Sequence, residues 1–290
     1  MNPPTKKQKN SGTNKIYLAD NLRVLRDMQA GSVDLVYIDP PFNTKKLRKH
    51  TRLKTKQSIL GDRIGFGGKR YQTEKNGTLA YEDSYSDYLT FLEPRLANAY
   101  ILLKETGSLF LHLDYREVHY CKILLDGIFG RECFMNEIIW HWDYGPKAKN
   151  KWSAKHNNIL WYTKDPKKYT FNYDKIDRIP YMAPGLVTKE KAERGKLITD
   201  TWFHTIVPTN SKERTGYPTQ KPLGILKRII SVHSSPGETV LDFFAGSGTA
   251  GEAAALLGRQ FILIDNNKEA VRISAKRLKQ YKPECIGFKR

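Results

Sequence analysis

Near its start the chain carries Asp39-Pro40-Pro41-Phe42, residues that could together hold and orient a planar amino compound. The Asp39 carboxylate and the Pro40 carbonyl accept hydrogen bonds, so they could bind the two hydrogens of one amino group. The two prolines restrict the backbone, so these acceptors lose little conformational freedom when a ligand binds. Phe42 adds a flat face for ring stacking. Taken alone, an Asp-Pro-Pro turn is equally well an ordinary strand end.

A glycine loop near the end of the chain could bind a nucleotide; its residues 242–249 read Asp-Phe-Phe-Ala-Gly-Ser-Gly-Thr. A strand, a glycine loop and a helix in succession present backbone N–H groups to phosphate or ribose. Gly246 and Gly248 allow close backbone approach, and Asp265 lies at the end of the next strand, where it can bond ribose hydroxyls. Dehydrogenases share this geometry and are the natural rival, although the third glycine of their fingerprint is missing.

Hydrophobic spacing predicts the elements that position these motifs. Expected strands cover 15–20, 33–38, 108–114, 239–242 and 261–264, with a pair at 137–142 and 157–163. Expected helices cover 22–28, 88–103, 118–129, 223–232, 249–257 and 270–278. Alternating strands and helices of this kind predict a mostly parallel sheet with helices on both faces. We expect Asp20 to end a strand beside the strand of Asp39, at the same edge of the sheet.

The composition indicates a polyanionic partner. The chain has 49 Lys and Arg against 30 Asp and Glu, a formal net charge of +19. Neutralising phosphates with such side chains releases counterions, which favours nucleic acid as the partner. A ribosomal or membrane-surface protein could carry the same charge, so the charge alone defines only the class of partner.

Cysteine usage and hydropathy exclude several other classes. Three cysteines without a C-x-x-C pair speak against a disulfide framework or a four-cysteine zinc site, and no metal site is expected. The sequence contains no run of 18 apolar residues, so neither a membrane-spanning helix nor a membrane partner is expected. The polar start is no secretory signal, and we expect a cytoplasmic protein.

Two segments depart from the α/β pattern. Residues 43–80 are basic and glycine-containing, and we expect a mobile loop there that grips DNA, with a solvated insertion as the alternative. Residues 165–216 show no α/β repeat and are expected to form an inserted target-recognition region. The expected division of the chain is a flexible basic tail (1–14), a catalytic half (15–164, with the loop 43–80), the recognition region (165–216) and a cofactor-binding half (217–290).

In this order the two motifs resemble those of beta-class bacterial DNA amino-methyltransferases, in which the catalytic loop precedes the cofactor loop. Thr219-Gln220-Lys221-Pro222, just upstream of the glycine loop, is similar to a segment of the same family. The resemblance implies a Rossmann-like α/β fold, with a mostly parallel doubly wound sheet, a permuted motif order and an inserted recognition region. It also implies S-adenosylmethionine as the cofactor.

The resemblance further implies the roles of individual residues. For Asp20, capping of the following helix is the alternative to cofactor binding. For Asp242, hydrogen bonding to the loop backbone is the alternative to cofactor binding. The catalytic residues implied are Asp39, Pro40, Pro41 and Phe42. The cofactor-binding residues implied are Asp20, Thr219, Lys221, Asp242, Phe243, Phe244, Gly246, Gly248, Thr249 and Asp265.

The implied reaction is methyl transfer to adenine N6 in double-stranded DNA, on a base turned out of the helix. An N4-cytosine or RNA amino-methyltransferase and an inactive nucleic-acid-binding subunit remain as alternatives. A homodimer and a cognate restriction endonuclease are further expected partners. Four tryptophans (140, 142, 152 and 161) are expected to pack in the core or a hairpin rather than stack on bases. Expected phosphate contacts are Lys45, Lys46, Arg48, Lys49, Arg52, Lys54, Lys147 and Lys149.

Overall fold

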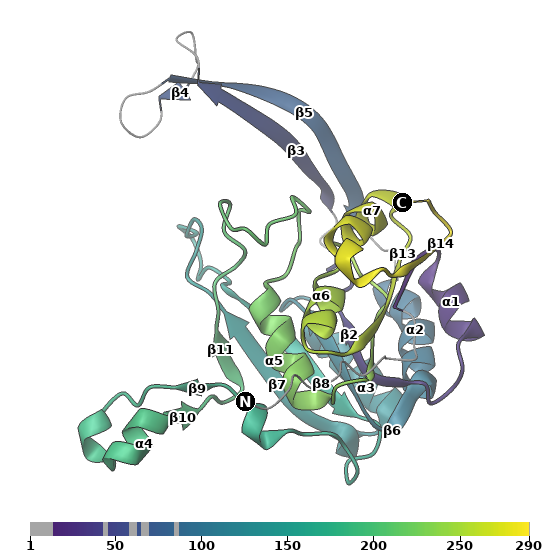
Figure 1. Ribbon diagram of the computed structural model, residues 1–290, viewed down its shortest axis with the longest axis vertical. Helices are drawn as coiled ribbons and strands as arrows, with labels where there is room; N and C mark the ends of the chain where they lie inside the picture. The colour runs from purple at the N-terminus through teal and green to yellow at the C-terminus, as the bar shows by residue number, and fades with distance from the viewer. Residues whose placement is uncertain (1–13, 43–45, 58–62, 65–69, 84–86, 290) are drawn as a thin grey trace, which may run out of the picture.

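A nine-stranded sheet forms the centre of the molecule, in the order β11-β7-β8-β6-β2-β12-β13-β1-β14 (Figure 1). The computed structural model describes residues 14–42, 46–57, 63–64, 70–83 and 87–289, with the backbone alone in the strands between 46 and 83. Every strand of this sheet except β8 points the same way, because β8 is antiparallel to both of its neighbours.

The bounds of the elements are as follows. The strands of the main sheet are β1 (Lys15–Leu18), β2 (Val33–Ile38), β6 (Leu103–Leu113), β7 (Phe134–His141), β8 (His156–Thr163), β11 (Thr201–Phe203), β12 (Thr239–Asp242), β13 (Gln260–Asp265) and β14 (Glu284–Ile286). The helices are α1 (Asn21–Asp27), α2 (Tyr88–Leu102), α3 (Val118–Phe129), α4 (Lys189–Arg194), α5 (Leu223–His233), α6 (Thr249–Leu256) and α7 (Lys268–Arg277). None of the described helices has the length and apolar character needed to cross a lipid bilayer.

Helices cover both faces of the sheet, so β2 is buried on both sides. Leu35 and Tyr37 point into a core that the helices α5, α6 and α7 complete. Val36 and Ile38 point into the opposite core, beneath α1, α2 and α3. This doubly wound arrangement confirms the expected fold class, and it explains why β2 is an almost continuous apolar run.

The predicted helices and core strands are confirmed, but the prediction that the strand of Asp20 lies beside the strand of Asp39 is wrong. Asp20 follows β1, which pairs with β13 and β14, whereas β2 pairs with β6 and β12. The crossover from β1 to β2 therefore passes over two strands. The order of strands in a sheet depends on pairing between distant segments, and the local sequence of one strand–helix–strand unit does not predict that pairing.

The segment expected as a loop at 43–80 contains strands instead. β3 (Lys46–Gln57) and β5 (Arg70–Asp83) pair antiparallel, and β4 (Arg63–Ile64) pairs with β5. Figure 1 shows β3 and β5 as a long curved ribbon that extends away from the main sheet. Backbone pairing defines this ribbon, whereas the prediction relied on the apolar alternation typical of strands that cover a core.

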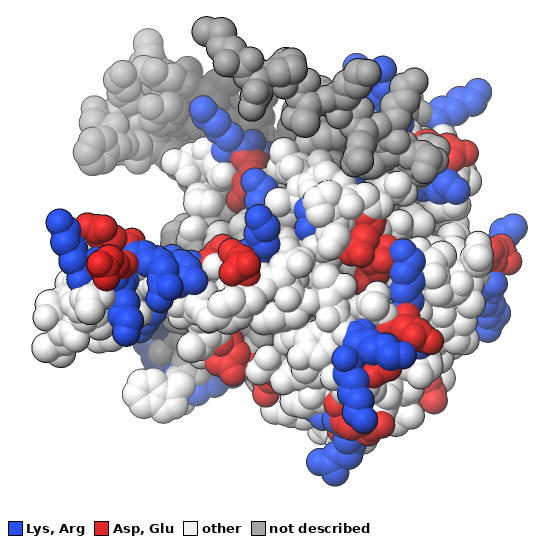
Figure 2. All heavy atoms as spheres, turned by 60° about the horizontal axis from the view of Figure 1, so that its bottom comes forward, with Lys and Arg blue, Asp and Glu red and all other residues white. Residues whose placement is uncertain are grey.

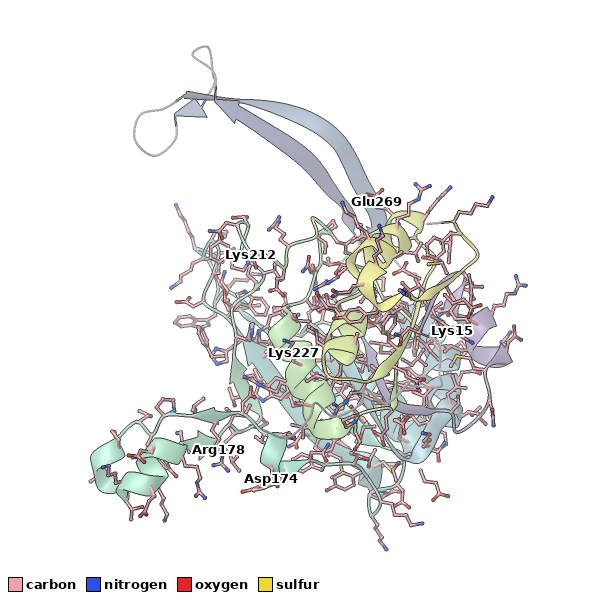
Figure 3. The ribbon with its side chains drawn as sticks, viewed as in Figure 1. Lys15, Asp174, Arg178, Lys212, Lys227 and Glu269 are labelled. Atoms are coloured by element: carbon pink, nitrogen blue, oxygen red, sulfur yellow. The ribbon has the colours of Figure 1, made fainter. Side chains whose placement is uncertain are left out.

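The region 165–216 is only partly separate from the main sheet. Its residues 201–203 form β11, which pairs parallel with β7 at the sheet edge, a boundary that the sequence did not predict. β9 (Arg178–Ile179) and β10 (Lys196–Leu197) pair antiparallel and, with α4 between them, form an arm that projects from the body (Figures 1 and 3).

His233, the last residue of α5, is buried among aromatic rings. Its ring centroid lies 4.3 Å from that of Trp161, 4.7 Å from that of Phe110 and 5.3 Å from that of Phe171. Burial lowers the pKa of His233 from its ordinary value of 6.5 to about 3. The imidazole is therefore neutral in the folded protein at neutral pH.

We predict that replacing His233 changes how stability depends on pH. Below pH 6.5 the unfolded chain binds a proton on His233 that the folded chain does not, so the free energy of unfolding decreases as the pH falls from 6.5 towards 3. The loss amounts to about 1.4 kcal/mol per pH unit. Urea unfolding at pH 7, 6 and 5 should show a shallower decline for His233→Phe than for the wild type. His119→Gln, on the exposed side of α3, is the control and should keep the wild-type profile; parallel curves for His233→Phe would contradict the prediction.

Candidate active site

The carboxyl ends of parallel strands place the two predicted motifs side by side. Asp39 follows β2 and the glycine loop follows β12, and these strands are direct neighbours in the sheet. The Asp34 carboxylate strengthens this pairing, because its Oδ2 accepts a 2.9 Å hydrogen bond from the Thr239 N–H and its Oδ1 lies 2.7 Å from the Lys104 ammonium. The edge formed by these strand ends is where ligands bind in open α/β sheets.

A cavity of about 600 Å³ opens at this edge of the sheet. Its wall contains every residue that was predicted to be catalytic or cofactor-binding except Gly248, the N-cap residue of α6. The predicted residues in the wall are Asp20, Asp39, Pro40, Pro41, Phe42, Thr219, Lys221, Asp242, Phe243, Phe244, Gly246, Thr249 and Asp265.

Asp265 holds the glycine loop in place. Its Oδ2 accepts a hydrogen bond from the Gly246 N–H and its Oδ1 accepts one from the Asn267 N–H, both 2.8 Å long. Gly248 has a φ of +74°, and a Cβ there would lie 2.8 Å from Ser274 Oγ. The turn therefore requires glycine for its backbone angle and for the close approach of α7.

Asp242 bonds its own loop, one of the two roles that the sequence left open. Its Oδ1 accepts a 3.0 Å hydrogen bond from the Phe244 N–H, and the side chain is buried. Burial raises the pKa of Asp242 well above its ordinary value, and the nearby charges of Asp39 and Asp265 raise it further. Burial also raises the pKa of Asp265, against the effect of its backbone hydrogen bonds.

Lys221 contacts the turn Asp39-Pro40-Pro41-Phe42, the proposed catalytic tip. Its Nζ lies 2.5 Å from Asp39 Oδ2 and 4.9 Å from the centre of the Phe42 ring. Both members of the ion pair are largely covered, with side-chain exposures of 12% for Lys221 and 15% for Asp39. The sequence predicted that this ammonium binds the cofactor carboxylate; in the structure it contacts the Asp39 carboxylate.

Gln220 fixes the segment that carries Lys221. Its Oε1 accepts hydrogen bonds from the Thr215 N–H (2.7 Å) and hydroxyl (2.8 Å), and its Nε2 donates to the Glu213 carbonyl (2.7 Å). Thr249 Oγ1 donates to the Lys221 carbonyl over 3.3 Å. These bonds tie the backbone of the segment to itself and to α6, while the Lys221 side chain extends to Asp39 in the cavity wall.

Asp20 takes the N-cap role that was weighed for it, and its contact with the cofactor stays a prediction. It caps α1 by accepting a 3.1 Å hydrogen bond from the Arg23 N–H, and it also lines the cavity. Arg95, a residue that the sequence analysis missed, lies 3.2 Å from Asp20 Oδ2 and donates to Asn21 Oδ1 over 2.7 Å. The available signal was a charged residue at a buried-face position of α2, between Leu92 and Leu96.

A buried polar chain beside the catalytic tip was also missed. Asn157 Nδ2 donates to His112 Nε2 over 2.9 Å, so the His112 proton is on Nδ1, which donates to the Tyr37 hydroxyl over 2.7 Å. Burial lowers the pKa of His112 well below its ordinary value, and the charge of Lys221 acts in the same direction. A neutral imidazole thus supports Tyr37, which lines the cavity next to the tip.

The predicted phosphate-binding lysines lie in two places. Lys147 and Lys149 are exposed in the connection from β7 to β8, at the same sheet edge as Asp39. In that connection Trp152 is 98% exposed, contrary to the expectation that it packs. The remaining predicted contacts lie outside the residues whose side chains the structure describes: Lys45, Lys46, Arg48, Lys49, Arg52 and Lys54.

The sheet, the cavity and the two motif loops form the kind of site that enzymes with an open α/β sheet use, at the carboxyl ends of neighbouring strands. Residues 33–276 match the family model of N6/N4 methyltransferases, described as DNA methylase. The match covers most of the chain, which therefore belongs to the DNA methylase family.

Curated relatives agree with this family. The chain is 30% identical over 276 residues to the DNA adenine methyltransferase YhdJ of Escherichia coli (strain K12), a match that covers 89% of this chain and 80% of the relative. It is 29% identical over 264 residues to the Type II methyltransferase M.HpaI of Haemophilus parainfluenzae, covering 91% of this chain and 74% of the relative.

Solved structures share the fold. The M1.HpyAVI–SAM complex superposes with a TM-score of 0.59 at 22% identity, covering 91% of this chain and 98% of that chain. The PvuII DNA methyltransferase (cytosine-N4-specific) superposes with a TM-score of 0.61 at 14% identity, covering 95% of each chain. These likenesses support the class I methyltransferase fold.

We predict that Gly248→Ala destabilises the protein. An alanine would be strained at a φ of +74° and would meet Ser274, so the free energy of unfolding should fall by about 1–3 kcal/mol. Gly127→Ala in α3 is the matched control, since open space surrounds that position and alanine favours a helix. Urea unfolding of both variants checks the prediction; equal stability of Gly248→Ala and the wild type would contradict it.

Proposed function

We propose that this chain transfers a methyl group from S-adenosylmethionine to adenine N6 in double-stranded DNA, at a specific site. The observation that carries the proposal is the shared cavity, in which the Asp39 tip and the glycine loop of neighbouring strands face one ligand space. Direct transfer needs both reactants in one space, and holding them there accounts for a large part of the rate.

The cavity suits this cofactor. Four carboxylates line it (Asp20, Asp39, Asp242 and Asp265) against two cations (Arg95 and Lys221), which favours a ligand with positive charge. When bound, S-adenosylmethionine supplies a methyl group on a positively charged sulfur. Asp265 would bind the ribose hydroxyls with its remaining lone pairs, Asp20 the adenine amino group, and Thr219 and Lys221 the methionine end.

The catalytic tip would prepare the base. The nitrogen of an exocyclic amino group shares its lone pair with the ring, so it is a weak nucleophile. Hydrogen bonds from its two hydrogens to Asp39 and the Pro40 carbonyl would draw the nitrogen towards tetrahedral geometry and free the lone pair for in-line attack on the methyl group. The nitrogen gains the methyl as the bond from that group to sulfur breaks, and it then gives up one proton, for which Asp39 is the candidate acceptor. Phe42 stacks on the base, which must leave the duplex at a cost of a few kcal/mol.

Adenine is the favoured base because Asp stands first in the tip, a feature that usually accompanies adenine N6 in the resembling family, and because YhdJ is named a DNA adenine methyltransferase. Cytosine N4 is the second candidate. The cytosine-N4-specific PvuII enzyme has the same fold, and both bases carry an amino group beside a ring acceptor.

DNA would bind along the edge that carries the cavity. The connection 142–155 presents Lys147 and Lys149 there beside exposed Trp152, and the charge of +19 favours phosphates. The ribbon β3–β5, which follows the catalytic tip in the sequence, would grip the duplex. Because several relatives are named Type II methyltransferases, the proposal extends to a cognate restriction endonuclease. The homodimer that the resemblance implies is part of the proposal as well.

The direct test is incubation with methyl-labelled S-adenosylmethionine and unmethylated bacterial DNA, followed by mass analysis of the nucleosides. The expected product is N6-methyladenine, and sequencing then locates the modified positions. Label in N4-methylcytosine would keep the mechanism and change the base. If no nucleoside becomes labelled when DNA and structured RNA are each supplied as the substrate, the proposal is overturned.

We predict that Asp39→Ala lowers the turnover number by a factor of about 10²–10⁴, because the amino group loses its carboxylate acceptor. Binding of S-adenosylhomocysteine, measured by calorimetry, should persist. Asp27→Ala, at the exposed end of α1, is the control and should keep the full rate. An Asp39→Ala protein with the wild-type rate would refute the assignment of the tip.

We predict that replacing both Lys147 and Lys149 by Gln weakens DNA binding and flattens its dependence on salt. If each lysine neutralises one phosphate, the slope of log K against log salt should fall by about 0.9 per lysine. Lys276→Gln with Lys279→Gln is the matched control, since both are exposed near the C-terminal end of α7, away from the cavity residue Asn267 at its other end, and should leave the slope unchanged. Lysines of α4 are unsuitable, because that arm, where Figure 2 shows Lys and Arg mixed with Asp and Glu, belongs to the expected recognition region. Equal slopes for both double variants would count against this DNA-binding edge.

A further inference from the structure

The Lys221 ammonium stands where the proposed reaction needs the amino group of the base. It lies 2.5 Å from Asp39 Oδ2 and 4.9 Å above the Phe42 ring. An ammonium and an exocyclic amino group are both N–H donors, and both are attracted to a carboxylate and an aromatic face. Lys221 therefore satisfies the same two groups that the reaction assigns to the target base.

The two occupants exclude each other. With only 2.5 Å between Lys221 Nζ and Asp39 Oδ2, no room remains for the amino group of a base between them. The ion pair is largely shielded from water, so it is stronger than a surface pair and must be replaced by contacts of similar value when a base enters. Entry of the base thus requires the ammonium to move to another acceptor.

The backbone around Lys221 limits this movement to its side chain. Gln220 bonds Thr215 and Glu213, and Thr249 bonds the Lys221 carbonyl, so the segment itself is anchored on both sides. The side chain has several rotatable bonds and lies in the wall of the cavity. Within the same cavity, the carboxylate of the bound cofactor is an anion that can replace Asp39 as its partner.

We infer that Lys221 orders the binding of the two substrates: it covers Asp39 and Phe42 until the cofactor is in place, and then leaves them for the cofactor carboxylate so that the base can enter. This inference rests on the proposed function. It makes Lys221 a positioning residue that couples cofactor binding to base entry, so that the base is turned out of the duplex mainly when a methyl donor is present.

The coupling can be measured without methyl transfer. The probe is a duplex with 2-aminopurine at the methylated position located by sequencing, because its fluorescence rises when the base leaves the stack. Titrations are carried out without a nucleotide, with S-adenosylhomocysteine, and with 5′-methylthioadenosine, which lacks the amino-acid part. For the wild type, S-adenosylhomocysteine should tighten binding of the unstacked base about tenfold, whereas 5′-methylthioadenosine should have little effect.

Three variants separate charge from other effects. Lys221→Met keeps the length and removes the charge, so it should unstack the base equally well with and without S-adenosylhomocysteine. Lys221→Arg keeps a cation and should retain the coupling. Lys227→Met changes an exposed lysine of α5, labelled in Figure 3, and should behave as the wild type.

Retention of the full coupling in Lys221→Met, or its absence in the wild type, would overturn the inference. Such a result would leave the proposed function intact as long as the wild type still forms a methylated nucleoside in DNA. If no methylated nucleoside forms, the proposed function fails and the inference fails with it.

Discussion

The parallel pairing of β2 with β12 is the contact on which the site depends. It places the turn after β2 beside the glycine loop after β12, although about two hundred residues separate them in the sequence. Asp34 reinforces the pairing from the opposite end by bonding Thr239 and Lys104. The two cores on either side of the sheet pack against these strands, so that the proposed catalytic acceptors and the glycine loop face one cavity.

Crowding of carboxylates at the sheet edge is the second physical constraint. Asp39, Asp242 and Asp265 lie close enough to raise the pKa of Asp242 in addition to the effect of its burial. The structure offsets this repulsion with backbone N–H groups on Asp242 and Asp265 and with the Lys221 ammonium on Asp39. A cationic ligand would relieve the same repulsion, which links the electrostatics of the protein to its proposed cofactor.

Local sequence predicted most of the elements because their information is local. The helix α3 and the strand β2 are defined by their own apolar spacing, and both were predicted close to their bounds. The ribbon β3–β5 was missed since no apolar alternation marks it, and β14 was missed because it is a three-residue edge strand. The edge strand β11 was hidden in a region of irregular composition, and only its pairing with β7 reveals it.

The sequence by itself determined the residues of the site: the turn Asp39-Pro40-Pro41-Phe42, the glycine loop and the acidic residues after the strands, because the proposed functions require particular residue types at short spacing. Only the tertiary structure decided which partners they meet. Strand order separates β1 from β2, Arg95 reaches Asp20 and Asn21 from another helix, and Lys221 contacts Asp39 across the cavity. Such contacts join residues far apart in the chain, so they follow from packing and not from any local pattern.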